Sequence, residues 1–148
     1  MVPGTTESVN NGTIRLDGER VTDLVLPFQI DNLDVRGRIT RLGPTLSEVL
    51  SAHAYPATVA QLLAEALALT ALLGSVLRED GGQLTIQAKA NGPVSLLVVD
   101  YLAPGAVRGY AQFDAEAIKA IEPGAPLETL FGEGYLAITV DKTLNTER

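Results

Sequence analysis

One segment of this sequence limits the possible folds more than any other. Residues 66–77, ALALTALLGSVL, are apolar on nearly every helical face, and no charged residue lies between Glu65 and Arg78. Crossing the hydrocarbon core of a membrane takes about 20 consecutive apolar residues, whereas this uncharged run has 12. We therefore expect it to be part of a helix inside a folded domain and not a membrane span.

The apolar segment is predicted to lie in the second half of a long helix. Pro56 suits the first turn, because the N–H that proline lacks would be unpaired there, and the helix is expected to continue to about Glu79, ahead of a glycine pair. Only Gln61, Glu65 and a few small hydroxyl residues interrupt its apolar positions, so it lacks the wide polar face of a surface helix. Other elements should therefore cover it on two opposite sides.

Segments of alternating polarity supply the covering layers. Residues 24–42 are predicted to form one half-buried strand. Residues 83–90, 94–101 and 106–113 are separated by turn signals that contain Gly and Pro and are expected to form an antiparallel meander, and residues 135–142 a final strand. The predicted fold class is α+β, with a long buried helix sandwiched between antiparallel β-sheets in β/α/β layers.

Shorter helices are expected beside these elements. Thr45 and Glu48 have the spacing of a capping box, in which each side chain satisfies a backbone donor at the helix start, and they predict a short helix to about His53. Residues 114–126 are expected to hold one short helix and a break, and residues 127–131 a further helical turn. His53 would lie near a helix C-terminus, where a cationic side chain is favoured, and we interpret its role as structural.

The length and charge of the chain limit its organisation and its partners. A chain of 148 residues is expected to fold around one core and to bury about 68–70% of the surface that the unfolded chain exposes. Residues 1–20, rich in Gly, Asn, Thr and charge, are predicted to be a flexible leader, and residues 21–148 the core domain. The net charge of −7 repels polyphosphate and anionic lipid, so we expect no nucleic-acid or membrane partner.

The ionisable residues do not form a recognisable catalytic set. The absence of cysteine excludes a thiol nucleophile, and the single histidine excludes a multi-histidine zinc site. No spacing selects a catalytic pair among Glu65, Asp100 and Asp114. Because a carboxylate on a mostly buried helix needs a partner, Glu65 is expected to pair with an arginine such as Arg36 or Arg108. The alternative is a small-ligand-binding or enzymatic domain that uses Glu65 and the nearby arginines in an interior pocket.

Arg36, Arg38 and Arg41 form a small basic cluster in an acidic chain. Such a cluster could receive a phosphate or an acidic segment of a partner. We favour the simpler interpretation, in which these side chains form the solvated face of a strand.

Five segments, read in chain order, carry a family resemblance: DVRGRITRL, YPATVAQLLAEALALTALL, GGQLTIQAKANGPVSLLVVDY, VRGYAQF and LFGEGYLAITVDK. Together they resemble the N-terminal core domain of the redox-regulated thirty-three-kilodalton heat-shock chaperonin family over residues 24–148. The resemblance implies a non-enzymatic, ATP-independent holdase of the bacterial cytoplasm, which binds unfolding client proteins through apolar surface and is activated by oxidation. A cytoplasmic location agrees with an N-terminus that lacks the pattern of a secretory signal.

The resemblance also implies a redox switch that this sequence does not contain. In the family the switch is a C-terminal zinc module with four cysteines in CxC and CxxC pairs, whereas this sequence has no cysteine. We therefore expect no cofactor in this chain and zinc only in a module beyond residue 148. The ending TLNTER looks like the turn of a hairpin without its return strand, so the core domain is interpreted as incomplete at its C-terminal end. An unpaired strand edge predicts self-association, as a homodimer or a larger assembly.

The residues expected to bind clients come from two neighbouring strands of the meander. An exposed apolar sheet surface marks a protein-interaction site, and strand alternation selects for it Leu97, Val99, Tyr101, Arg108, Tyr110 and Gln112. A further interpretation stays open, in which the chain is a structural domain whose apolar surface pairs with its own copy.

Overall fold

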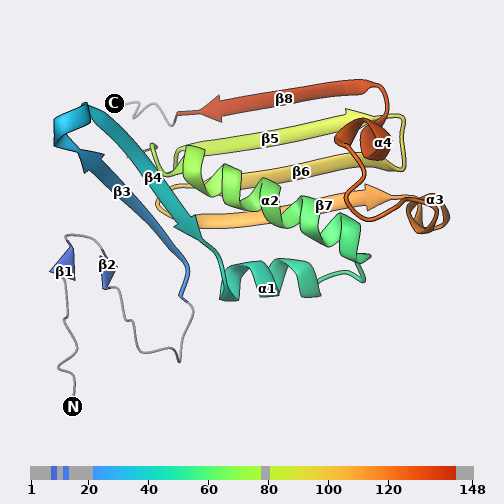
Figure 1. The fold of residues 1–148 in the computed structure, drawn as a ribbon, viewed down its shortest axis with the longest axis horizontal. Helices are drawn as coiled ribbons and strands as arrows, with labels where there is room; N and C mark the ends of the chain where they lie inside the picture. The colour runs from blue at the N-terminus through green and yellow to red at the C-terminus, as the bar shows by residue number, and fades with distance from the viewer. Residues whose placement is uncertain (1–7, 10–11, 14–21, 78–80, 143–148) are drawn as a thin grey trace, which may run out of the picture.

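The computed structural model describes residues 8–9, 12–13, 22–77 and 81–142. A four-stranded antiparallel sheet carries one long helix on one face, and a separate two-stranded hairpin lies across the end of that helix (Figure 1). The strands are β1 Ser8–Val9, β2 Gly12–Thr13, β3 Leu24–Ile30, β4 Val35–Arg41, β5 Gln83–Ala90, β6 Val94–Leu102, β7 Ala106–Phe113 and β8 Gly134–Asp141. The helices are α1 Pro44–Ser51, α2 Ala57–Gly74, α3 Ala115–Lys119 and α4 Leu127–Phe131. Most of the predicted leader lies outside the described residues; within it, β1 pairs with β2.

The four-stranded sheet has the strand order β7-β6-β5-β8, and every neighbouring pair is antiparallel. The predicted meander of β5, β6 and β7 is therefore confirmed, and the predicted last strand, β8, returns to pair with the other side of β5. Leu84 on β5 lies opposite Tyr101 on β6 and Val140 on β8, and residues directly opposite one another share a face of the sheet. These three residues mark the face on which α2 lies.

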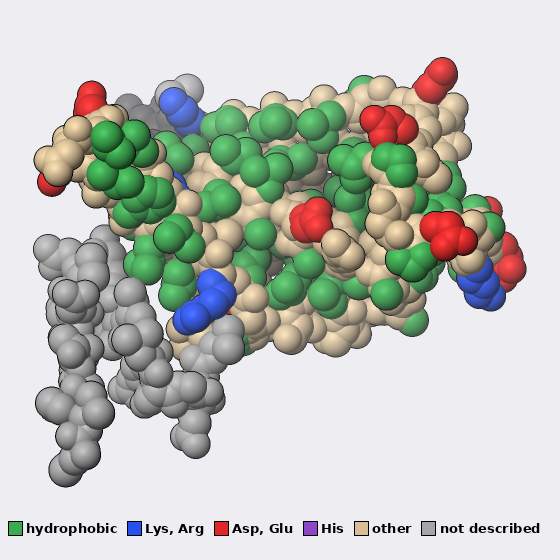
Figure 2. Space-filling view, viewed as in Figure 1, with side chains coloured by type: hydrophobic (Ala, Val, Ile, Leu, Met, Phe, Trp, Pro, Cys, Tyr) green, Lys and Arg blue, Asp and Glu red, His purple; other side chains and the backbone are tan. Residues whose placement is uncertain are grey.

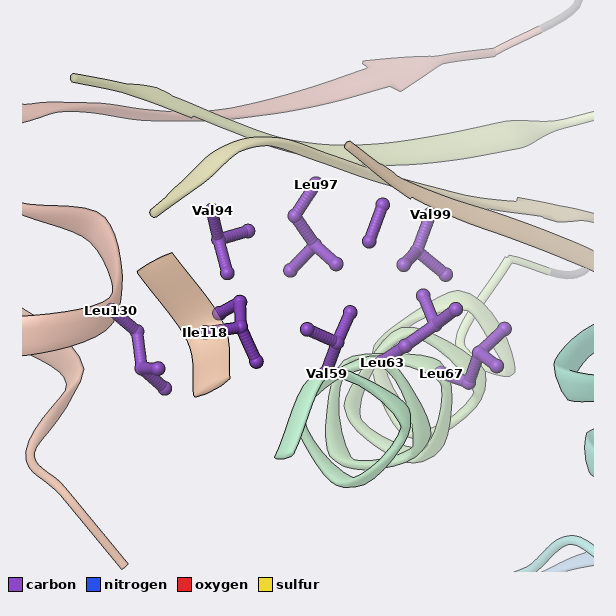
Figure 3. Close-up of a cluster of buried hydrophobic side chains, with 9 residues drawn as sticks. Val59, Leu63, Leu67, Val94, Leu97, Val99, Ile118 and Leu130 are labelled. Atoms are coloured by element: carbon purple, nitrogen blue, oxygen red, sulfur yellow. The ribbon is translucent and has the colours of Figure 1, made fainter. Parts of the chain in front are cut away.

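One stripe of α2 packs on this face. Val59, Leu63 and Leu67 recur every four residues, are fully buried, and pack with Leu97 and Val99 of β6 (Figure 3). Full burial of a side chain of this kind contributes about 1.5–3 kcal/mol, so this stripe decides how the helix is oriented. The α+β class and the packing of the long helix against an antiparallel sheet are confirmed.

The second covering layer is the hairpin β3–β4, and it reaches only the C-terminal end of α2. Arg38 on β4 donates from Nη1 to the carbonyl oxygen of Ser75 at 3.3 Å and to its hydroxyl oxygen at 3.1 Å. These bonds attach the hairpin to the turn that follows α2. The hairpin therefore leaves much of the outward side of α2 open (Figure 1).

The single strand predicted for residues 24–42 is wrong, because two strands occupy this region. A short 3-10 helix, Asp31–Leu33, is followed by Asp34 with φ of 50°, and together they reverse the chain between β3 and β4. Asp and Asn adopt this left-handed conformation more readily than most residues. The run DNLD is thus a turn signal that the continuous alternation of apolar and charged residues conceals.

The N-terminus of α1 is satisfied by a residue from outside the helix. Its N-cap residue, Gly43, has no side chain, and no capping box forms. The carboxylate of Asp23 instead accepts hydrogen bonds from the N–H of Gly43 at 2.7 Å, from the N–H of Thr45 at 3.1 Å, and from the Thr45 hydroxyl. The predicted capping box of Thr45 and Glu48 is therefore wrong, although the helix itself is present.

The long helix is shorter than predicted but still long. It ends at Gly74 instead of Glu79, which lies outside the described residues. Gly74 packs closely on Tyr101, because a Cβ atom on this glycine would lie 2.3 Å from the tyrosine ring. With 18 residues and a mean hydropathy of 1.6, α2 has the length and composition of a membrane-spanning helix. The uncharged run of 12 residues considered in the sequence is shorter than the helix and did not show this. The core helix of a folded domain has the same properties, and six residues of α2 are buried in this structure.

The two helical segments predicted between β7 and β8 are confirmed as α3 and α4. Asp114 caps α3 by accepting hydrogen bonds from the N–H groups of Glu116 at 3.0 Å and Ala117 at 3.2 Å. Ile118 of α3 and Leu130 of α4 are buried in the main core (Figure 3). These short helices close the end of the core beyond the first residues of α2.

Candidate functional site

The outward side of α2 changes character along the helix. Its first half presents Gln61 and Glu65, whose side chains hydrogen-bond to each other at 3.1 Å. Its second half presents Leu69 and Leu73, which are 50% and 43% exposed. Val76 follows just beyond the end of the helix and is 58% exposed. The outward side of α2 is therefore polar in the first half of the helix. In the second half it is an apolar stripe that is exposed at the surface.

Strand β8 exposes apolar side chains on the face of the sheet that carries α2. Leu136, Ile138 and Val140 lie opposite buried or half-buried residues of β5, yet they are 65%, 55% and 49% exposed. The reason is that α2 crosses β5, β6 and β7 and does not extend over β8 (Figure 1). The sequence shows three large apolar residues at alternate positions of the last strand, but this alternation predicts a half-buried strand and does not show that the residues are exposed.

These two groups form what we call the apolar surface: Leu69, Leu73 and Val76 with Leu136, Ile138 and Val140. Figure 2 shows hydrophobic side chains gathered over β8 and along α2 on one side of the molecule. A second group lies on one face of the hairpin and consists of Phe28, Ile30, Val35 and Ile39, all more than two fifths exposed. Large exposed apolar patches on a folded domain mark sites of interaction.

A groove of about 640 Å³ separates the hairpin from the end of α2. Its walls come from both elements, and the residues that line it are Pro27, Phe28, Gln29, Arg36, Gly37, Arg38, Leu72, Leu73 and Val76. The groove therefore continues the apolar stripe of α2 and adds two arginines to it. The third arginine of the predicted cluster, Arg41, points to the opposite face of β4 by strand alternation, so the cluster is divided between two faces.

The six residues predicted to bind clients do not share one surface. In the register of β6 and β7, Val99 lies opposite Gly109, whereas Arg108 lies opposite Asp100. Leu97, Val99 and Tyr101 consequently face α2 and are buried beneath it, while Arg108, Tyr110 and Gln112 belong to the other face and are exposed. The expectation of a single exposed face is wrong, because alternation within each strand does not fix the register between strands. A role of the three exposed residues in client binding stays a prediction.

Asp100 organises the polar network on the open face of the sheet. Its carboxylate accepts hydrogen bonds from Thr85 at 2.6 Å, from Nε of Arg108 at 2.6 Å and from Gln83 at 3.4 Å. Burial raises the pKa of Asp100, but the hydrogen bonds from Thr85 and Arg108, the charge of Arg108 and the bond from Gln83 outweigh it and lower the pKa below its ordinary value. The group is therefore an ionised structural carboxylate.

Glu65 is not the buried, paired carboxylate that the sequence suggested. It is exposed on α2 and bonded by Gln61, and Arg108 forms its ion pair with Asp100. The expected partners Arg36 and Arg108 are therefore wrong for Glu65. Glu65, Asp100 and Asp114 each lie on a different element with separate hydrogen bonds, so these three carboxylates do not assemble a catalytic pair.

His53 belongs to an aromatic cluster beside strand β7. Its ring lies 5.5 Å from the ring of Tyr55 and 5.3 Å from that of Tyr110, both edge to face, and Tyr55 lies 6.0 Å from Phe113. The Tyr55 hydroxyl also accepts a hydrogen bond from the backbone N–H of Ala111 at 3.3 Å. A structural role for His53 agrees with this packing, although His53 lies beyond the end of α1 and not within its last turn.

The zinc site that the family resemblance implies does not fit the residues of this chain. The sequence has no cysteine and one histidine, so it supplies no thiolate ligand. Within residues 8–9, 12–13, 22–77 and 81–142, no group of three potential metal ligands comes together.

Comparison with known proteins places this fold in a family. The family model described as Hsp33 protein matches residues 23–148. The 33 kDa chaperonin of Caulobacter vibrioides (strain NA1000 / CB15N) is 47% identical over 131 residues, covering 85% of this chain and 42% of that protein. The 33 kDa chaperonins of Ectopseudomonas mendocina and Azotobacter vinelandii are 45% and 44% identical over 121 and 119 residues, covering 82% and 80% of this chain and 40% and 39% of those proteins.

The chain thus spans about two fifths of the length of the curated relatives that it matches. The matched region runs from the residue before β3 to the end of the sequence, and so contains the hairpin, α2, the four-stranded sheet and the groove. The chain belongs to the Hsp33 protein family.

Proposed function

We propose that this chain is the client-binding core of an ATP-independent holdase chaperone. The observation that carries the proposal is the exposed apolar surface of α2 and β8. A folded domain normally buries side chains of this kind unless they bind an apolar partner. Unfolding proteins expose apolar segments that fit such a surface. The name of the relatives, 33 kDa chaperonin, supports a chaperone, which is a binding protein and not an enzyme.

The chemistry of the apolar surface suits many different clients. Burial of apolar area stabilises a complex by about 25 cal/mol for each Å² and requires no directional bonds. Different client segments can therefore dock on the same leucine, isoleucine and valine side chains with similar free energy. Nucleotide hydrolysis has no part in this binding step, because association itself removes the apolar area from water.

A light-scattering assay tests the proposal. A client enzyme is heated in reducing buffer without ATP, alone and with an equal molar amount of this chain. We expect the chain to suppress aggregation, and the double substitution Leu73→Gln and Ile138→Gln to weaken suppression, because each lost apolar contact costs about 1.5 kcal/mol, roughly tenfold in affinity.

The matched control is the double substitution Leu102→Gln and Leu127→Gln. These two leucines are 45% and 57% exposed and lie on the open face of the sheet and on α4; neither is one of the six residues that form the apolar surface. The control should suppress aggregation as well as the unsubstituted chain does. Absence of suppression by the unsubstituted chain, or equal loss in both double variants, would count against the proposal.

Redox regulation is proposed to belong to a zinc and cysteine module outside this chain, as the family resemblance implies. Because the sequence has no cysteine, the holdase activity of these residues should be the same in reducing and oxidising buffer. The same assay with added hydrogen peroxide measures this. We further propose unfolded client proteins as the partners and the cytoplasm as the location.

A second candidate function, self-assembly, is favoured by one observation. Strand β8 is at the edge of the described sheet, and an open strand edge can pair with a second copy. A concentration-dependent sedimentation coefficient together with failure to bind unfolded protein would support a structural assembly domain in place of a holdase.

A further inference from the structure

The groove between the hairpin and α2 combines two features that the apolar surface alone does not have. Its floor is apolar and comes from Leu72, Leu73 and Val76, whereas its opposite wall carries Arg36 and Arg38 of β4. Its volume of about 640 Å³ lies within the range of about 300–1,000 Å³ that is usual for binding pockets. The groove is thus large enough for several side chains and has one apolar and one basic side.

The charge of the groove is opposite to that of the whole chain. The net charge is −7, yet none of the described residues that line the groove is acidic. Among the residues that the structure describes, Arg36 has no ion pair and Arg38 is bonded only to the neutral groups of Ser75. Two guanidinium groups therefore face an apolar floor, and neither forms an ion pair with the described part of the chain.

We propose that this groove binds an apolar polypeptide segment that carries a carboxylate side chain. The inference rests on the proposed holdase function and names the class of client segment that one site prefers. Leu72, Leu73 and Val76 take the apolar side chains, and Arg36 pairs with the aspartate or glutamate, since guanidinium and carboxylate form the strongest charge-assisted hydrogen bonds among side chains. Arg38, held in place by Ser75, adds positive charge without having to move.

The position of Arg36 makes it the residue to change. Arg38 fixes the hairpin to the end of α2, so its loss would alter the groove itself. Arg36 lies on the same face of β4 two residues earlier and is exposed. Arg41, on the same strand but on the other face, provides a control with an identical change in charge.

Fluorescence anisotropy with three labelled ten-residue peptides tests the inference on the whole 148-residue chain. The peptides share their apolar residues and carry two glutamates, two glutamines or two lysines at the same positions. At low salt we expect the glutamate peptide to bind about fivefold more tightly than the glutamine peptide, and the lysine peptide most weakly. In 0.5 M salt the preference should shrink to less than about twofold, because the charges are partly exposed.

The variants assign the preference to the groove. Arg36→Gln should reduce the preference for glutamate over glutamine to less than about twofold, while Arg41→Gln should retain it. Circular dichroism and the midpoint of thermal unfolding verify that both variants are folded. Equal affinity for the glutamate and glutamine peptides, or a preference that Arg36→Gln leaves unchanged, would overturn the inference.

Two further outcomes separate this inference from the proposed function. If the chain suppresses client aggregation but shows no preference for glutamate, the holdase proposal stands and the groove inference fails. If laurate binds with dependence on Arg36 while none of the peptides binds, the groove takes a free anionic amphiphile and the inference of a polypeptide occupant is wrong. If no peptide binds and aggregation is not suppressed, both proposals fail.

Discussion

The carboxylate of Asp100 links three strands of the sheet through side-chain hydrogen bonds. It lies on β6, accepts from Thr85 and Gln83 of β5, and forms an ion pair with Arg108 of β7. The side chain of Asp100 is only 12% exposed, whereas that of Arg108 is 79% exposed. An ion pair with an exposed partner contributes little to stability, whereas a hydrogen bond to a buried carboxylate is costly to lose. We therefore expect the bonds from β5 to stabilise the sheet more than the charge of Arg108 does. This arrangement fixes the register of the meander on the face opposite α2.

Replacing Asp100 with Asn tests this role at the scale of one residue. An amide keeps the shape but brings a donor toward Arg108, so we expect the free energy of unfolding at pH 7 to fall by about 1–3 kcal/mol. Urea denaturation measures it. The exposed Asp141→Asn at the end of β8 is the control and should change stability by less than about 0.5 kcal/mol.

The pH dependence of the same variant follows from the lowered pKa of Asp100. A carboxyl group whose pKa is lower in the folded state contributes stability above its unfolded value, and that contribution is lost as the pH falls through the folded value. The unfolded value is close to the ordinary 3.8. The difference between the unsubstituted chain and Asp100→Asn should therefore be constant above about pH 5 and decrease below pH 4. A difference that grows as the pH falls would contradict this sign.

At the scale of elements, the sequence predicted those that local patterns determine. The alternation of Leu84 and Ile86 with polar residues identified β5, and the apolar run identified α2. The turn between β3 and β4 was missed although its signal, the run DNLD, is local. Two other errors arose where distant residues decide. Asp23 replaces the capping box of α1 from outside the helix, and the register of β6 and β7 separates Val99 from Arg108. Neither pairing leaves a signal within a short window of sequence.

The candidate site was predicted only in kind, as exposed apolar sheet surface. Its location depends on where α2 lies. Ile138 on β8 and Ile86 on β5 both lie in strands of alternating polarity and share a face of the sheet, but Ile86 is buried and Ile138 is exposed because no helix lies above β8. A helix of fixed width covers three strands of the sheet and leaves the fourth. That limit is a property of packing and cannot be read from the strand itself.

The cap of α1 gives a prediction at this scale. Asp23→Ala removes the acceptor for two backbone N–H groups, and we expect the free energy of unfolding to fall by about 1 kcal/mol, the usual cost of losing a helix N-cap. Glu48→Ala is the informative control, because the capping-box interpretation assigns the same cost to it, whereas the structure leaves Glu48 without a capping role. Chemical denaturation of both variants distinguishes the two; equal losses would restore the capping box.

On the scale of the whole molecule, the two edges of the sheet are unequal. Along β7, the Tyr55 hydroxyl accepts from the N–H of Ala111, and α1 packs beside the strand. Within the described residues β8 pairs only with β5. One edge is thus protected by an aromatic cluster, while the other combines open backbone groups with the exposed side chains of the apolar surface. Association with a second copy should therefore begin at β8.

Sedimentation velocity over a range of concentrations tests this expectation. We expect the chain to self-associate at tens of micromolar and Ile138→Lys to shift the equilibrium toward monomer, because a lysine on an edge strand must be desolvated when a second strand pairs there. Leu102→Lys changes the charge equally on an inner strand, where Leu102 is 45% exposed, and should leave association unchanged. A monomer at every concentration would rule out pairing through β8, and equal dissociation in both variants would assign association to net charge and not to this edge.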